Sequence, residues 1–181
     1  MTKTQLKSKL KKLIQCKKIG KYQKLVRQRF LDDLIFGEER GIYFDFKLCD
    51  RVVKFLEMMP HTKGAKASQK EFLVLEEWQK YDIIYPLFGF YKKKETIDKK
   101  TNKKIIKKVR RYQVAYNEIA RKNGKSMLSS GIANYLAFAD NEYGAEVYSV
   151  ATKKEQARFV FDVWEQMKSN TVLKYRVKTA Y

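Results

Sequence analysis

The sequence is poor in the residues that build disulfide bonds and metal sites. Among its 181 residues it has 2 cysteines, Cys16 and Cys49, and 1 histidine, His61. Two cysteines without a motif are too few for a disulfide framework or a zinc site, which favours a reducing, cytosolic compartment. Because His61 has no partner histidine or cysteine, we expect it to be a loop residue rather than a catalyst or metal ligand.

Long apolar runs are also missing. No stretch of 18 apolar residues occurs, so we expect no membrane-spanning helix. The basic N-terminus lacks the apolar region and the small-residue cleavage site of a signal peptide. By contrast, the hydrophobic content of 44% and the 11 Phe and 12 Tyr residues indicate a packed globular protein with one sizeable core.

Acidic residues are only half as numerous as basic ones, and the imbalance is local. Residues 1–30 contain 11 Lys and Arg and no acidic residue, and residues 92–111 contain 11 Lys and Arg against 2 acidic residues. The rest of the chain has 18 residues of each sign. Blocks of this kind often bind DNA or RNA, although similar lysine-rich faces occur on proteins that bind nothing.

Hydrophobic periodicity predicts helices and strands in turn. Helical spacing of apolar residues predicts helices over 4–18, 21–37, 45–59, 76–85, 127–139 and 153–169, with Pro86 and Gly89 closing the fourth. A β-hairpin is expected over 90–109, with the turn formers Asp98, Thr101 and Asn102 at its tip. Further strands are expected over 111–120 and 145–151.

The motif with chemical content is RKNGKS at residues 121–126, between a predicted strand and a predicted apolar helix. Phosphate binding needs a glycine that lets the backbone approach, a lysine that reaches the β- and γ-phosphates, and a hydroxyl that holds Mg²⁺. Gly124, Lys125 and Ser126 supply these in order, but Ile119 replaces the usual first glycine. The alternative is a basic turn in which Ser126 caps the helix.

The strand–loop–helix–strand–helix order that begins at residue 111 has the spacing of a βαβ unit. We therefore expect an α/β fold: an incomplete P-loop NTPase fold, with a parallel sheet and flanking helices. A basic helical N-terminal region precedes it, and a basic β-hairpin is inserted in it. Thr152, Lys153 and Gln156 then follow a strand at the sheet edge where such folds bind ligands, although Thr152 would serve equally as a helix N-cap.

The loop and the sequence after it, GIANYLAFADNEYGAEVYSVATKKEQA, resemble the large terminase subunits of tailed phages, which package DNA. HTKG at 61–64 and FLVLEEWQKYDIIYPLFGF at 72–90 add to the resemblance, which covers about residues 44–165. Members of this family have a deviant phosphate loop that lacks the first glycine and carries an arginine near its start, as Arg121 does here.

The resemblance implies a role for each matching residue. Lys125 and Ser126 would bind ATP phosphates and Mg²⁺, while Lys122, Asn123 and Gly124 would shape the loop. Arg121 would stabilise charge on the γ-phosphate, unless it is a solvated loop residue. Gln79 would bind adenine. Trp78 would assist it or, alternatively, would be a core aromatic residue.

The resemblance also implies what the complete protein does. Residues 1–40 are expected to form a basic helical segment, and residues 41–181 the first portion of an ATPase domain that stops before the acidic metal and water motif. Such a fragment should bind ATP but be inactive alone. The complete motor would form an oligomeric ring in the cytoplasm of the infected bacterial host, and would act on double-stranded DNA with a small terminase subunit and a portal.

Two other functions fit parts of the sequence. A helicase-like ATPase shares the glutamine upstream of the phosphate loop, but its loop usually has small residues where Arg121 and Lys122 stand. A non-enzymatic nucleic-acid-binding module would account for the net charge of +20. Nucleotide binding that depends on Lys125 separates both ATPases from such a module.

Overall fold

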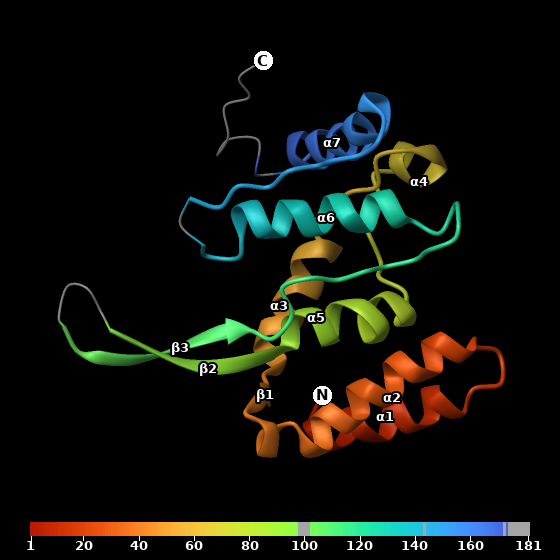
Figure 1. Cartoon of the computed structure of the whole chain (residues 1–181). Coiled ribbons are helices and arrows are strands. Elements are labelled where there is room, and N and C mark those ends of the chain that lie inside the picture. The colour runs from red at the N-terminus through yellow and green to blue at the C-terminus, as the bar shows by residue number, and fades with distance from the viewer. Residues whose placement is uncertain (98–101, 143, 172, 174–181) are drawn as a thin grey trace. The chain divides into compact units, whose positions relative to one another are not determined.

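The computed structural model describes residues 1–97, 102–142, 144–171 and 173 (Figure 1). The chain forms two compact units: residues 1–51 with 76–117, and residues 52–75 with 118–181. Within the described part of the chain, every helix falls short of the length and apolarity needed to cross a bilayer.

The first unit begins with the two predicted basic helices, and both are confirmed. They are α1 (Lys3–Gln15) and α2 (Lys21–Phe36), followed by the 3₁₀ helix η1 (Glu38–Arg40), strand β1 (Ile42–Phe44) and the start of α3 (Phe46–Glu57). Helix α1 begins where it does because Thr2 and Gln5 form a capping box, each side chain bonding the other residue's backbone N–H.

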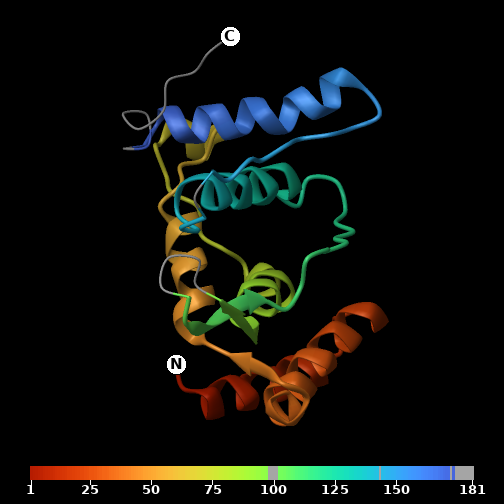
Figure 2. The same ribbon diagram turned by 60° about the vertical axis from the view of Figure 1, so that its left-hand side comes forward.

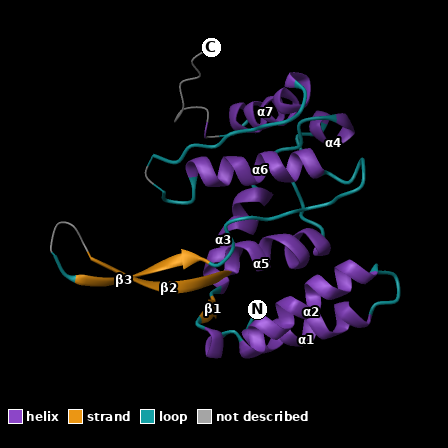
Figure 3. Ribbon diagram, in the orientation of Figure 1, coloured by secondary structure: helices purple, strands orange, loops and turns teal. Residues whose placement is uncertain are grey.

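The predicted hairpin is also confirmed. It consists of β2 (Phe90–Ile97) and β3 (Lys104–Arg110), and with β1 it forms an antiparallel sheet of order β1-β2-β3 (Figure 3). Strand β1 pairs only with residues 90–92 of β2, so in the described sheet the remainder of the hairpin is a two-stranded ribbon. The predicted turn formers Asp98 and Thr101 lie outside the described residues.

The core of the first unit is aromatic. Phe30 of α2, Phe44 of β1 and Phe90 of β2 meet with ring centroids 5.0 to 5.7 Å apart, in tilted or edge-to-face arrangements. Gly89 precedes Phe90 because any side chain there would collide with the ring of Phe44; a Cβ would lie 2.3 Å from Cε2. This cluster fixes the base of the sheet against α2.

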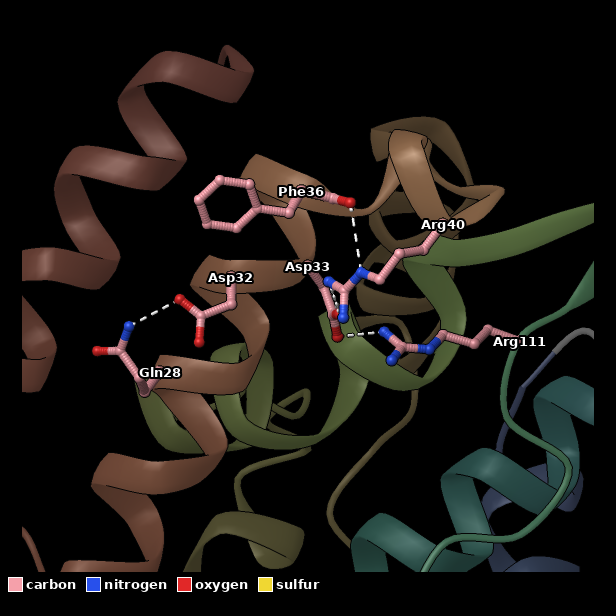
Figure 4. Close-up of polar contacts among 6 residues, drawn as sticks. All are labelled: Gln28, Asp32, Asp33, Phe36, Arg40 and Arg111. Atoms are coloured by element: carbon pink, nitrogen blue, oxygen red, sulfur yellow. Dashed lines mark hydrogen bonds and ion pairs between the residues drawn. The ribbon is translucent and has the colours of Figure 1, made fainter.

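Two buried ion pairs tie α2 to the rest of the first unit. The Arg27 guanidinium donates to both carboxylate oxygens of Asp82 at 2.6 and 3.0 Å, and also to the Leu13 carbonyl. The side chain of Asp33, which is 2% exposed, accepts from Arg111, the residue after β3, and from Arg40 at 2.8 Å (Figure 4). The Arg27–Asp82 and Arg111–Asp33 contacts are largely shielded from water, so each one matters more than a surface pair.

Helical structure continues past Pro86, contrary to prediction. The π-helix η2 (Gln79–Ile84) leads directly into α5 (Tyr85–Gly89), which ends at Gly89 as expected. Pro86 lies in the first turn of α5, where a missing N–H is tolerated, and the preceding π-turn shifts the hydrogen-bond ladder.

The second unit contains the end of α3, the short α4 (Gly64–Ser68), α6 (Lys125–Phe138) and α7 (Lys154–Ser169). The predicted helices 127–139 and 153–169 are thus confirmed. Ser130 Oγ donates to the Val160 carbonyl at 2.8 Å, and Asn134 Nδ2 lies 3.4 Å from the Trp164 carbonyl. From the first contact to the second, the residue number rises by four on α6 and by four on α7, so the two helices run in the same direction.

The structure does not show the two further predicted strands. Residues 111–120 and 145–151 are loop, and no strand pairing joins them to another described residue. Their apolar side chains are exposed, Val114 and Tyr116 at 86% and Val150 at 89%. A strand exists only when a neighbour pairs with its backbone, and alternating side chains alone cannot supply that neighbour. The described sheet is accordingly antiparallel, and the predicted parallel sheet is not seen.

We predict that Asp33→Asn will lower the free energy of unfolding by about 3 kcal/mol, because it leaves the buried guanidinium of Arg111 without its counter-charge. Urea denaturation measures the change. The matched control is Glu38→Gln, which removes the exposed ion pair with Lys3 and should leave the unfolding midpoint unchanged. Equal midpoints for the two variants would contradict the importance of the buried pair.

We predict that the two thiols will differ in reactivity. Cys49 is fully buried, and burial, assisted by the charge of Asp50, raises the pKa of its thiol to about 12. Cys16 is half-buried. At pH 8 a thiol reagent such as Ellman's reagent should therefore label Cys16 alone in the folded protein, and both thiols in denaturant. Labelling of Cys49 at the rate of Cys16 in the folded chain would contradict the described packing.

Candidate nucleotide-binding site

The predicted phosphate loop forms a tight turn at the start of α6. Gly124 is the N-cap residue, with a left-handed φ of 72°, and Lys122 has a φ of 67°. Glycine adopts this conformation freely, whereas a lysine does so at a cost of roughly 1 kcal/mol. A strained non-glycine residue beside the helix start is a feature that often accompanies a functional loop.

The amino end of α6 is left open. The first hydrogen bond of the helix runs from Leu128 N to the Gly124 carbonyl at 2.9 Å, so the N–H groups of Lys125, Ser126 and Met127 have no acceptor within the helix. No described side chain caps Gly124, and the first turn has no acidic residue. The helix end therefore presents a partial positive charge and free donors to solvent.

The loop side chains add to this positive field. Arg121, Lys122, Asn123 and Lys125 are exposed, and no hydrogen bond or ion pair joins them to another described residue; Ser126 is half-buried. Ser126 does not cap the helix, so the alternative of a serine-capped basic turn is not what the structure has. Three cationic side chains without a described acidic partner, around an open helix end, form an arrangement suited to an anion.

Two polar residues that sequence analysis missed hold α6 in place. Ser130 and Asn134 are fully buried and bond the backbone of α7. Gly131 lies beside them because a Cβ there would meet Leu56 Cδ2 at 2.6 Å. In the sequence, Ser130 and Asn134 are polar residues four positions apart in a largely apolar helix, and this spacing predicts that they share a face.

Thr152 lies in the bend before α7, where it is exposed. The N-cap of α7 is Lys153, and no described side chain caps it, so Thr152 is not the helix N-cap that the sequence offered as the alternative to a ligand-binding role. Because α6 and α7 run in the same direction, their amino ends lie at the same end of the helix pair (Figure 2), and Thr152 precedes the start of α7 by two residues. The structure thus brings Thr152 to the loop's end of the second unit.

Trp78 and Gln79 belong to the first unit. Gln79 begins the π-helix, and its Oε1 accepts a hydrogen bond from Glu76 N at 2.9 Å. Trp78 is half-buried. A hollow of about 220 Å³ in the same unit has Arg29, Asp33 and Tyr112 in its wall, but neither Trp78 nor Gln79 lines it.

Comparison with known proteins gives one result. Residues 104–180 match the family model described as terminase large subunit, ATPase domain, and this match contains the loop, α6, Thr152 and α7. No curated protein and no solved structure matches the chain. The match confirms the resemblance seen in the sequence: residues 104–180 are similar to the ATPase domain of terminase large subunits.

Proposed function

We propose that this chain supplies the ATP-binding loop of a viral DNA-packaging motor, in which ATP hydrolysis is coupled to DNA translocation. The observation that carries the proposal is the open amino end of α6, where a left-handed glycine precedes Lys125 and Ser126. It lies inside the segment that matches the terminase ATPase family.

In this proposal the backbone N–H groups of residues 125–127 donate to phosphate oxygens, which the helix dipole attracts. The ammonium of Lys125 reaches the β- and γ-phosphates from its exposed position. Ser126 carries a hydroxyl oxygen, the kind of ligand that Mg²⁺ prefers, and would hold the ion together with the phosphates. When bound, the ion neutralises charge on the phosphates.

The residues before Gly124 would complete the loop. Arg121 is free of described partners and could stabilise charge on the γ-phosphate, while Lys122 and Asn123 set the course of the backbone into Gly124. Thr152 would lie beside the nucleotide from the start of α7. These roles follow from position and chemistry, since each side chain is exposed at the phosphate end of the unit.

We also propose that Gln79 and Trp78 bind adenine. Gln79 would need both its amide oxygen and its NH₂ group to pair with the base edge, so it would have to release the N–H of Glu76. The half-buried ring of Trp78 could then stack on the base.

The proposal also includes the P-loop fold with its parallel sheet. We infer that residues 111–120 and 145–151 serve as strands of a parallel P-loop sheet when neighbouring strands pair with them. What supports this is their exposed Val and Tyr side chains and the parallel α6 and α7 that follow them. Pairing would bury the side chains that are now open to water.

We predict that Mg-ATP binds with an affinity that Lys125→Ala reduces by about tenfold or more, because the lysine is the main point charge on the phosphates. Isothermal titration calorimetry measures it. Lys66→Ala, which removes an exposed lysine on α4 of the same unit, is the matched control and should bind like the parent chain. Equal affinity in all three proteins would rule out the phosphate-loop assignment.

We predict that Gly124→Ala will lower the free energy of unfolding by about 1 kcal/mol and will weaken ATP binding, since alanine is strained at a φ of 72°. Gly20 provides a matched control, because it is also a helix N-cap residue but has a φ of −72° and open space around it. Gly20→Ala should be tolerated. If both substitutions have the same small effect, the left-handed turn is not required.

A further inference from the structure

The register of the hairpin places lysine opposite lysine twice. Lys93 pairs with Lys108, and Lys94 pairs with Lys107 one position further along the ribbon. Like charges directly across a sheet repel, so two such pairs in succession weaken the hairpin. Because side chains alternate between faces, the two pairs lie on opposite faces of the ribbon.

On the face that carries Lys93 and Lys108, aromatic and acidic side chains of the first unit compensate the two lysine charges. Lys93 lies over the ring of Tyr43 at 4.3 Å, and Lys108 lies over Tyr91 at 4.6 Å and bonds Asp45 at 3.1 Å. The hydrogen bond to Asp45 raises the pKa of Lys108, which holds its charge in place. We call this the paired face.

The face that carries Lys94 and Lys107 has no such compensation. Lys92 lies on this face too, two residues before Lys94, and all three are exposed. Among the described residues none of the three has an acidic or aromatic partner. Among the paired positions of β2 and β3 from Lys92 onward, the remaining residues of this face are the uncharged Thr96, Ile105 and Val109. We call this the open face.

We propose that the open face of the hairpin, through Lys92, Lys94 and Lys107, binds the phosphate backbone of double-stranded DNA. This extends the proposed function by naming a contact between motor and substrate, but it is carried by the hairpin's register and not by the nucleotide loop. A ligand that neutralises the open face relieves the Lys94–Lys107 repulsion that folding leaves uncompensated.

The dimensions of the ribbon favour a DNA duplex. Beyond β1 the hairpin has no described third strand, so it can enter the major groove of B-DNA, which accommodates a two-stranded β-ribbon. The major groove of an RNA duplex is too deep and narrow for this. The open face has lysines, which bind phosphate as point charges, and lacks the Arg, Asn and Gln that read base edges, so binding should not depend on sequence.

The test compares two double variants of the whole chain. Each variant removes two charges from a single face, and the two variants change different faces. Lys94→Gln with Lys107→Gln changes the open face, and Lys93→Gln with Lys108→Gln changes the paired face one register position away. Duplex DNA binding is measured by fluorescence anisotropy over a range of salt concentrations, without nucleotide. Thermal unfolding checks both variants, and the open-face variant should be at least as stable as the parent chain.

We expect the open-face variant to lose about tenfold or more in DNA affinity at 0.1 M salt, with a log–log salt slope smaller by about 2. The paired-face variant should lose much less, and binding of an RNA duplex of equal length should change little in either. Equal losses for the two faces, or an unchanged open-face variant, would overturn the proposal. A loss as large for RNA as for DNA would overturn the assignment to DNA.

These outcomes separate this inference from the nucleotide site, which is tested by Lys125→Ala and calorimetry. If ATP binds as proposed but the two hairpin variants are equivalent, only the hairpin contact is wrong. If the open face governs DNA binding but ATP does not bind, the hairpin contact stands and the nucleotide site is wrong.

Discussion

The first unit depends on the burial of charged groups on α2. Charged side chains on a helix ordinarily face solvent. On α2, however, Arg27 is only 3% exposed and Asp33 only 4% exposed as whole residues. Each is satisfied by a partner from a distant part of the chain, Arg27 by Asp82 and Asp33 by Arg111. Removing water from these groups is costly unless every lone pair and proton finds a partner, so these contacts fix the positions of α2, η2 and β3 together.

The same pairing changes how the net charge should be interpreted. Part of the basic N-terminal segment is engaged within the fold, since Lys3 pairs with Glu38 and Lys9 with Glu77. These lysines are paired with acidic residues of the same unit and are less available to a polyanion than the sequence suggests. On the open face of the hairpin, by contrast, no described acidic or aromatic partner compensates the lysine charges, so this face is the stronger candidate for DNA contact.

The second unit uses electrostatics in the opposite way. Where the first unit satisfies charged groups internally, the start of α6 leaves donors and positive charge unsatisfied. Helix ends are normally capped, and an uncapped one surrounded by Arg121, Lys122 and Lys125 is unfavourable until an anion arrives. Buried hydrogen bonds from Ser130 and Asn134 to α7 supply the rigidity that holds this helix end in position.

The sequence by itself determined the local features of this protein. Periodicity located α1, α2, α3, α6 and α7, alternation and turn residues located the hairpin, and the order Gly-Lys-Ser placed the RKNGKS loop at the start of a helix. These features depend on neighbours along the chain, so a local pattern is enough to specify them. Only the tertiary structure decided that residues 111–120 and 145–151 are loop, that Pro86 is accommodated within a helical run, and that Lys94 stands opposite Lys107. Strand pairing, cross-strand register and the ion pairs of Arg27 and Asp33 join residues far apart in sequence, and no local pattern encodes which distant group will be the partner.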